Sequence, residues 1–288
     1  MTYQTPDTNV LIEKTPAKLN IRLKVKGRRP SGYHELSSIM VPISLFDEIE
    51  FSWRRAGITL VCDGLSLPSH HNLAYRAAKA FFSHTGIDPA ISIKLTKTIP
   101  VAAGLGGGSS DAACTLNVLN THYSNPISPN ELAEIALHLG ADVPFFLASR
   151  PSVAQGIGEK LKPIENWPEF WYVVITPPIE VSTSWVYGNL KLELTTPDSD
   201  LIIDGLKSTP SQVRFLLEND LERVTASRFP VIDTIKKCLI EAGALGALMS
   251  GSGPSVFGVF ESKDQALSAE NYLSNRDFGD IFVATNWG

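Results

Sequence analysis

The stretch that most limits how this chain can fold is the glycine-rich segment 100–114, which reads PVAAGLGGGSSDAAC. Four of its residues are glycines: Gly104, Gly106, Gly107 and Gly108. Because glycine has no Cβ atom, such a loop can adopt positive φ angles and let an anion reach its backbone N–H groups. Ser109 and Ser110 are typical N-cap residues, and helix formers follow them. A helix N-terminus carries unpaired N–H groups and about half a positive charge, so the segment predicts a phosphate-binding loop.

Three other interpretations of this segment are a Walker-type P-loop, a dinucleotide-binding loop and a plain turn. A Walker-type P-loop ends in Gly-Lys-Ser or Gly-Lys-Thr, whereas this segment ends in Gly108, Ser109 and Ser110 without a lysine. A dinucleotide-binding loop is followed, about 20 residues later, by an acidic residue at the end of a strand, and residues 127–130 supply none. A plain turn between a strand and a helix stays open, although four glycines and two serines exceed what a tight turn requires.

Composition limits the partners of the chain. Its 288 residues, 43% of them hydrophobic, suffice for one large domain or two small ones. A net charge of −5 disfavours nucleic acid or an anionic membrane as the main partner. The three cysteines lie far apart without a C-x-x-C pair, which is typical of reduced thiols. Residues 1–14 contain neither a long apolar run nor a basic leader, so we expect a cytoplasmic protein without a membrane span.

Local signals predict the elements of the first half of the chain. Alternation of apolar and polar residues predicts a strand over residues 19–25, and a second strand over residues 91–95 leads into the glycine-rich segment. Asn72 and Gly86 are typical of the start and end of a helix, and Ser128 with Pro129 and Glu131 forms a capping-box pattern.

The character of the sequence changes near residue 158, where we expect a second domain to begin. Its predicted elements are two strands and two helices, over residues 171–176, 256–260, 231–242 and 263–273. Strands and helices that are not regularly alternating are typical of an α+β protein.

Several polar residues permit both a functional and a structural interpretation. Lys18 could be a solvated surface lysine, and Tyr33 with His34 could be half-buried at the start of a strand. Asp142 lies in an apolar run and could be a general base or the partner of a salt bridge. Residues 250–254 could form a plain turn. The residues by themselves leave each of these alternatives open.

Three segments, in order, resemble the motifs of the GHMP kinase superfamily: residues 15–23, 100–113 and 248–260. The resemblance implies an α+β, two-domain fold, with a ribosomal-protein-S5-like N-terminal domain (1–157) and a ferredoxin-like C-terminal domain (158–288). It leaves room for the last strand, about residues 281–288, to rejoin the N-terminal domain. ATP and substrate would lie in the cleft between the domains.

The resemblance also implies the functional residues. The catalytic residues would be Lys18 and Asp142. ATP would contact Asn72, Leu73, Lys97, Pro100, Gly104, Leu105, Gly106, Gly107, Gly108, Ser109 and Ser110. The substrate would contact Asn20, Tyr33, His34, Thr183 and Tyr187, supported by Gly251, Ser252 and Gly253. Mg²⁺ is expected with ATP, held by phosphate oxygens, water and Ser110 rather than by a protein metal site.

The activity that the resemblance implies is transfer of the γ-phosphoryl group of ATP to a hydroxyl of a small molecule. Residues 27–34 and 140–145 resemble the branch whose substrate carries a cytidine diphosphate group. A related mevalonate, homoserine or sugar kinase is one alternative, a non-catalytic ligand sensor a second, and a dinucleotide oxidoreductase a disfavoured third. A monomer and a homodimer are both compatible with the sequence.

Overall fold

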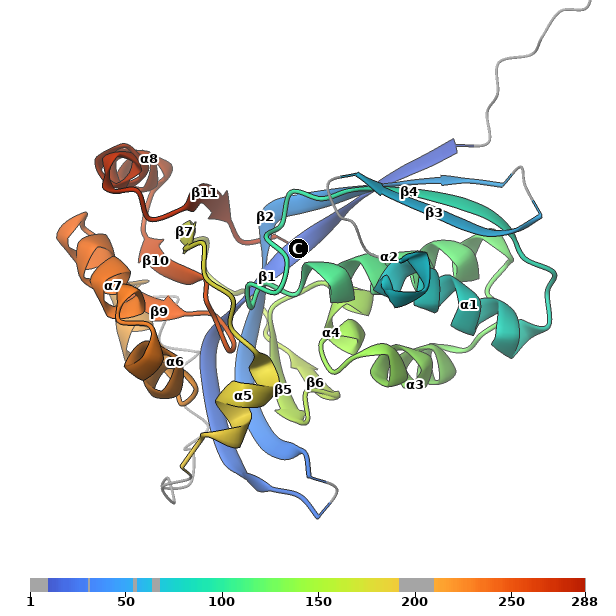
Figure 1. The fold of residues 1–288 in the computed structure, drawn as a ribbon, viewed down its shortest axis with the longest axis horizontal. Helices are drawn as coiled ribbons and strands as arrows, with labels where there is room; N and C mark the ends of the chain where they lie inside the picture. The colour runs from blue at the N-terminus through green and yellow to red at the C-terminus, as the bar shows by residue number, and fades with distance from the viewer. Residues whose placement is uncertain (1–9, 31, 54–55, 64–67, 192–209, 288) are drawn as a thin grey trace, which may run out of the picture. The chain divides into compact units, whose positions relative to one another are not determined.

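The computed structural model describes residues 10–30, 32–53, 56–63, 68–191 and 210–287 (Figure 1). These residues form two compact units, each assembled from separated parts of the chain. The first unit contains the chain up to Thr15, Phe46–Ile99 and Gly107–Leu147, and the second contains Pro16–Leu45, Pro100–Gly106 and Ala148–Gly288. Strands β1 (Val10–Arg28) and β2 (His34–Ser52) contribute to both units. A domain boundary at residues 157 and 158 stays a prediction.

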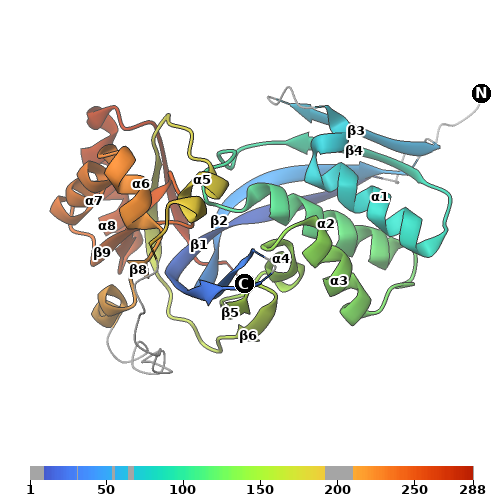
Figure 2. The same ribbon diagram turned by 60° about the horizontal axis from the view of Figure 1, so that its bottom comes forward.

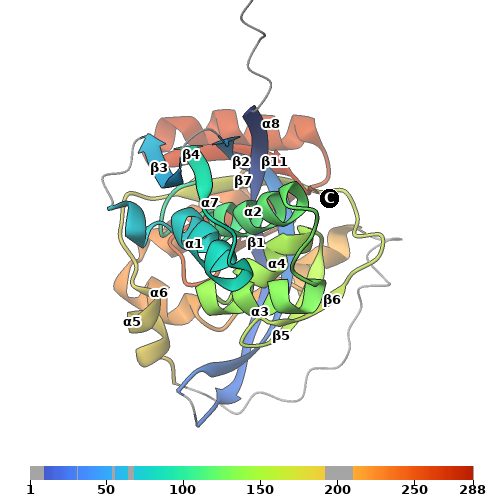
Figure 3. The same ribbon diagram turned by 90° about the vertical axis from the view of Figure 1, so that its right-hand side faces the viewer.

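The first unit combines a sheet with packed helices. Strand β4 (Ala90–Thr96) pairs in parallel with β3 (Gly57–Asp63) and antiparallel with residues 48–52 of β2. The predicted strand over residues 91–95 is thereby confirmed. Helices pack against one another in this unit (Figure 3): α1 (Leu73–Thr85), α2 (Gly107–His122) and α3 (Pro129–Leu139). Two short elements complete it: η1 (Ser69–His71) and α4 (Val143–Ala148).

The helix ends expected from local sequence signals are confirmed. The side chain of Asn72 accepts a hydrogen bond from Ala74 N at 2.9 Å and caps α1. Gly86 ends that helix with a left-handed φ of 70°, which glycine adopts readily. At α3, Ser128 and Glu131 form both hydrogen bonds of a capping box.

The second unit contains the remaining parts of β1 and β2. Residues 36–40 of β2 pair antiparallel with β5 (Ser152–Gly156), which pairs with β6 (Lys160–Pro163). Strand β1 pairs in parallel with β8 (Glu218–Asn219) at Arg22 and Leu23. The strand predicted over residues 19–25 is confirmed, and it extends over Val10–Arg28, beyond both predicted ends.

A four-stranded antiparallel sheet forms the rest of the second unit, in the order β11-β7-β10-β9. Its strands are β7 (Trp171–Thr176), β9 (Gly246–Met249), β10 (Val256–Phe260) and β11 (Asp280–Thr285). Helices α7 (Val231–Glu241) and α8 (Lys263–Leu273) pack on it (Figure 2). Strands β7 and β10 and helices α7 and α8 were predicted from the sequence, with α7 one residue shorter than predicted, whereas β9 was not predicted. Every residue of β10 is buried, so its continuous apolar run lies inside the core.

The second unit also contains shorter helices: α5 (Thr183–Gly188), η3 (Pro210–Phe215), α6 (Glu222–Arg228) and η4 (Ser274–Arg276). The last strand, β11, pairs along its length with β7. Asn286, just beyond it, forms a bridge with Ile43 of β2. Within the described parts of the chain, no helix has the length and apolar character needed to cross a membrane.

Candidate active site

Lys18 and Asn20 lie on β1 in the second unit, and both are 3% exposed. Side chains two residues apart on a strand point to the same face, so they can meet. Lys18 Nζ donates a hydrogen bond to Asn20 Oδ1, and Asn20 Nδ2 donates to Ser38 Oγ at 2.8 Å. The Ser38 hydroxyl donates in turn to the carbonyl of Arg22 at 2.7 Å. These bonds fix the Asn20 amide, which orients the Lys18 ammonium. A solvated surface position for Lys18 is therefore excluded.

The glycine loop, residues 100–106, is held in the second unit by its carbonyl groups. The carbonyls of residues 103, 104 and 105 accept hydrogen bonds from three donors: Ser255 N at 3.2 Å, Ser250 Oγ at 3.0 Å and Lys18 N at 2.8 Å. Across a trans peptide, the N–H of the next residue points away from the carbonyl. The N–H groups of Gly104, Leu105 and Gly106 therefore point away from the groups that hold the loop, which is the arrangement an anion-binding loop needs.

Two glycines of this loop have backbone angles that other residues rarely adopt. Gly104 has a φ of 80° and Gly106 a φ of 74°. At Gly104 a Cβ atom would lie 2.2 Å from the backbone oxygen of Ser250, so no other residue fits without movement of the backbone. Pro100, which begins the loop, is half-buried. The glycines thus serve both conformation and close packing.

Helix α2 begins at Gly107, so the prediction that Ser109 and Ser110 cap it is wrong. Gly107 lies in the first unit, where a Cβ atom would come within 3.0 Å of Ile99 Cγ2 and 3.1 Å of Asp47 Oδ2. Because glycine has no side chain, the helix can start at this crowded position. Both serines consequently lie in its first turn, Ser109 half-buried and Ser110 buried.

The first unit brings three of the predicted segments together around the start of α2. A Cβ atom on Gly108 would lie 3.5 Å from Leu73 Cδ1, which places the start of α1 beside α2. A Cβ atom on Gly140 would lie 3.8 Å from Ser109 Oγ. The half-buried Asp142 follows Gly140 in the turn that leads into α4. The predicted ATP-contacting Leu73, the first turn of α2 and the turn that carries Asp142 therefore lie near one another.

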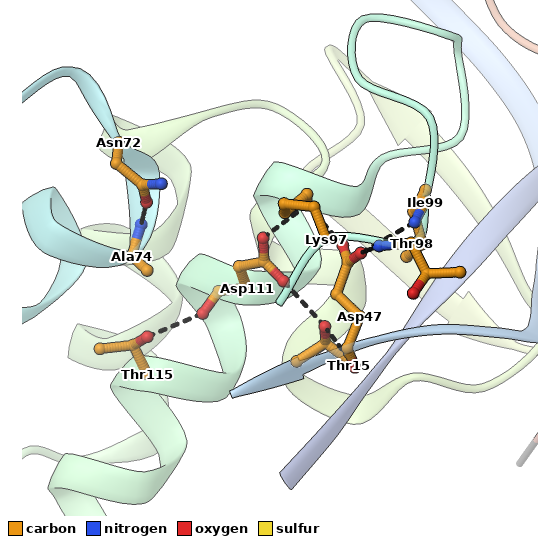
Figure 4. A network of polar contacts seen from close by, with 9 residues as sticks. All are labelled: Thr15, Asp47, Asn72, Ala74, Lys97, Thr98, Ile99, Asp111 and Thr115. Carbon is orange, nitrogen blue, oxygen red and sulfur yellow. Dashed lines mark hydrogen bonds and ion pairs between the residues drawn. The ribbon is translucent and has the colours of Figure 1, made fainter. Parts of the chain in front are cut away.

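Lys97 is the centre of a buried polar network in the first unit (Figure 4). Its ammonium forms ion pairs with Asp47 and, at 2.8 Å, with Asp111. The same Asp47 accepts hydrogen bonds from the backbone N–H groups of Thr98 and Ile99, at 2.6 and 2.8 Å. Thr15 Oγ1 donates to Asp111 at 2.8 Å. The network fixes the backbone just before the glycine loop and the first turn of α2 just after it.

The network contains more acidic groups than basic ones, because two carboxylates share one ammonium group. Burial acts to lower the pKa of Lys97, but attraction to Asp111 and Asp47 outweighs it and raises the pKa. Burial also raises the pKa of Asp111 to about 6; attraction to Lys97 opposes this change and repulsion from Asp47 adds to it. Lys97 therefore stays charged. If it contacts ATP, as predicted from the resemblance, it does so with a side chain that is already paired with two carboxylates.

We expect the Asp111→Asn variant to change how stability depends on pH. The pKa of Asp111 is higher in the folded chain, about 6, than its ordinary value of 3.8, so the folded state binds the proton more tightly. Its contribution to the free energy of unfolding is fully present below about pH 4 and is lost as pH rises through about 6. Between these pH values, the free energy of unfolding of the wild-type protein should fall by up to about 3 kcal/mol relative to that of the variant. This figure corresponds to about 1.4 kcal/mol per pKa unit.

Urea unfolding of both proteins from pH 4 to 7 measures this difference. A wild-type advantage that grows as pH rises would contradict the prediction, because it would mean that the folded state lowers the pKa of Asp111.

The third glycine motif, residues 250–253, lies beside Lys18 and Asn20. A Cβ atom on Gly251 would lie 3.3 Å from Asn20 Oδ1 and 3.5 Å from Lys18 Nζ. Ser252 Oγ lies 2.8 Å from Thr183 Oγ1, so the motif also reaches a predicted substrate-binding residue on α5. Gly253 has a φ of 85°. A plain turn would not explain these contacts with residues far away in the sequence.

Ser250 and Ser38 contribute to the site although the sequence did not single them out. Ser250 Oγ accepts a hydrogen bond from Asn20 N at 3.2 Å and donates to Gly104 O at 3.0 Å, so it joins β1 to the glycine loop. Ser250 is the first residue of the third glycine motif, and this position is the signal that could have identified it. Ser38 gave no such signal, because a serine in a strand is usually only a polar position.

His34 and Tyr187 form the candidate base-binding part of the site. Their rings stack with centroids 4.9 Å apart and planes inclined by 27°. Burial, helped by the charge of Arg28, lowers the pKa of His34, so its ring is neutral at pH 7. A neutral imidazole offers one donor and one acceptor, which suits the edge of a base. Tyr33, the residue just before His34, is 62% exposed and available to stack on a ligand.

Comparisons with known proteins support one family. The family model "GHMP kinases N terminal domain" matches residues 72–150, and the model "GHMP kinases C terminal" matches residues 205–279. A protein of Syntrophotalea carbinolica named 4-diphosphocytidyl-2-C-methyl-D-erythritol kinase is 50% identical over 91% of this chain and 93% of its own length. A protein of the same name from Geobacter sulfurreducens is 47% identical over 94% and 98%.

Solved structures agree with these relatives. The crystal structure of a 4-(cytidine 5'-diphospho)-2C-methyl-D-erythritol kinase matches with a TM-score of 0.83 and 35% identity, over 96% of this chain and 100% of that one. Homoserine kinase from Cytophaga hutchinsonii matches with a TM-score of 0.70 at 18% identity, over 99% and 98%, which supports the fold alone. The α+β, two-domain kinase fold expected from the sequence is confirmed.

Proposed function

The chain belongs to the GHMP kinase family, and from this membership we propose that it transfers the γ-phosphoryl group of ATP to the 2-hydroxyl of 4-diphosphocytidyl-2-C-methyl-D-erythritol. The observation that carries this assignment is the 50% identity, over 91% of the chain, to a protein named for that activity. The reaction belongs to the methylerythritol phosphate route to isoprenoids.

Phosphoryl transfer depends mainly on positioning and on stabilisation of charge. We propose that the N–H groups of the glycine loop and the first turn of α2 bind the phosphates of ATP. The oriented ammonium of Lys18 would offset charge on the transferred group, and Asp142 would accept the proton of the attacking hydroxyl. Mg²⁺ belongs to the proposal because it neutralises phosphate oxygens in such reactions. Among the described residues, no three His, Cys, Asp or Glu side chains are arranged to hold a metal.

The aromatic pair supports a substrate with a cytosine base. The neutral ring of His34 lies on the face of Tyr187, so its edge is held in a defined orientation for a hydrogen bond with the base. Tyr33 would close on the base by stacking. Thr183 and Asn20 would complete the substrate contacts. We propose these roles from the family resemblance together with the ring geometry.

We expect the Tyr33→Ala variant to raise the KM for the cytidylyl substrate by about 10-fold or more and to leave the KM for ATP nearly unchanged. Stacking on a base is worth ~1–3 kcal/mol, and about 1.4 kcal/mol corresponds to a factor of ten. Steady-state kinetics with each substrate varied in turn measures this. Phe215→Ala, which removes another ring of similar exposure, is the control and should change neither KM. Equal effects of Tyr33→Ala on both substrates would contradict a base-stacking role.

A coupled assay of ADP release tests the proposed function directly. The purified protein is incubated with ATP, Mg²⁺ and, separately, the cytidylyl substrate, mevalonate, homoserine and galactose. We expect turnover with the cytidylyl substrate alone. Turnover of one of the others instead would identify a related kinase, and ATP binding without turnover of any would identify a ligand sensor.

A further inference from the structure

Asn219, the last residue of β8, directly holds the third glycine motif. It is buried, and its Nδ2 donates to two carbonyl groups, Met249 O at 2.8 Å and Gly251 O at 2.8 Å. Its Oδ1 accepts from Leu221 N at 2.9 Å. Both donors of the amide and its oxygen are therefore used. The Asn219 amide therefore joins the two carbonyl groups on either side of Ser250 through one nitrogen.

The residues next to Asn219 extend this attachment to β1. Glu222 Oε2 accepts a hydrogen bond from Met249 N at 2.8 Å, so residue 249, just before the motif, is bound by the segment that contains Asn219. Asp220 accepts from Val25 N at 2.8 Å and from Lys24 Nζ at 3.0 Å. Asn219 thus binds the glycine motif, Glu222 binds the residue just before it, and Asp220 binds the strand that carries Lys18, all within the second unit.

The motif passes this constraint to the residues proposed to act on the substrates. Ser250 binds Asn20 N and Gly104 O, and a Cβ atom on Gly251 would contact the side chains of Lys18 and Asn20. Asn219 binds the carbonyl groups of Met249 and Gly251, so it holds the same short segment in place. A shift of the motif would therefore move the glycine loop and the Lys18–Asn20 pair together.

We propose that Asn219 is a positioning residue for the kinase reaction, which fixes the third glycine motif against Lys18 and the glycine loop. The proposal rests on the proposed function, because it assigns Asn219 a role in that reaction. Asn219 is not one of the residues proposed to contact a substrate, and its side chain binds backbone groups of Met249, Gly251 and Leu221. Its effect is to hold Lys18 and the glycine loop within the small positional tolerance that phosphoryl transfer requires.

Asn120 provides a matched control for a purely structural asparagine. It is buried to a similar degree, and its amide also binds loop backbone, donating to Ile127 O and accepting from Ile127 N, both at 3.0 Å. The loop that it holds is not part of the proposed site. Asn120→Ala should therefore lower stability without lowering kcat.

The experiment compares Asn219→Ala with Asn120→Ala in the full-length protein, with kcat and both KM values measured well below each melting temperature. We expect a comparable loss of Tm in both variants, but a fall in kcat on the order of 10²-fold only for Asn219→Ala, since small misplacements of reacting groups have effects of this size. The KM for ATP should change much less than kcat. Equal kcat values in the two folded variants would overturn the proposal.

Asn219→Asp, which keeps the shape and removes both donors, is the second variant if the alanine variant does not fold. A folded aspartate variant with wild-type kcat would overturn the proposal as well. The two hypotheses fail differently. If the wild-type protein does not release ADP with the cytidylyl substrate, the proposed function fails, whereas wild-type turnover with unchanged Asn219 variants leaves that function intact and excludes the positioning role.

Discussion

Replacing Asp142 with asparagine is expected to lower kcat by roughly 10²–10⁴-fold, the range that general acid–base catalysis contributes. A hydroxyl group is a weak nucleophile and must lose its proton as the phosphoryl group arrives. Asparagine keeps the shape of aspartate and removes its basicity, so the turn between Gly140 and α4 should be preserved and substrate binding largely unchanged. Single-turnover kinetics with saturating substrates measures the chemical step itself.

Lys18→Met should have a comparable effect, and the double variant tests whether the two residues act in one step. Residues of one catalytic unit are strongly non-additive, so the double variant should be little slower than either single variant. Multiplication of the two effects would indicate independent roles. Because Lys18 is buried and bound to Asn20, its variant is first compared with the wild type by thermal unfolding. Near-normal single-turnover rates for Asp142→Asn would contradict the role of Asp142 as the base.

Replacing Gly104 with alanine is expected to weaken ATP binding by at least about 100-fold, or about 2.8 kcal/mol at about 1.4 kcal/mol per factor of ten. The new Cβ atom would lie 2.2 Å from the backbone oxygen of Ser250, far inside the contact distance. Neither backbone can yield easily, because Ser250 binds both Gly104 and Asn20. The loop would have to leave the position in which its N–H groups point outward. Calorimetric titration with ATP measures the loss.

Gly86→Ala is the matched control for the effect of backbone conformation. Gly86 also has a left-handed φ, of 70°, but among the described residues nothing beyond its chain neighbours lies within 4 Å of the position that a Cβ atom would take. The substitution should cost about 1–2 kcal/mol of stability, the typical penalty of that conformation, and leave ATP affinity unchanged. If Gly104→Ala binds ATP as tightly as the wild type does, the glycine loop is not the phosphate-binding loop.

Local sequence determined much of the fold. The start of α1 at Asn72, its end at Gly86 and the capping box at Ser128 were all predicted and are all present. Strands β7 and β10 and helix α8 have the predicted bounds. These features depend on hydrogen bonds or periodicity among residues a few positions apart, so the information is contained in the segment itself. The three glycine motifs were also visible in the sequence, which is why the family could be expected.

The contacts between those segments could not be predicted from local sequence and are seen only in the folded chain. Helix α2 starts at Gly107 rather than after the serines, at a position where Asp47 and Ile99 leave little room for a side chain. Lys97 is paired with Asp47 and Asp111, which are separated from it by 50 and 14 residues.

The same holds for the residues that support the site. Ser250 meets Gly104 across 146 residues, and Asn219 meets Gly251 across 32. No periodicity or capping rule connects positions so far apart, and a serine or asparagine has the same local signals whether it is solvated or buried. The sequence alone therefore predicted many of the elements, the glycine motifs and the family. The burial of Lys18 arises only when the chain has folded, because Ser38 and Ser250, which fix its partner Asn20, come from other segments.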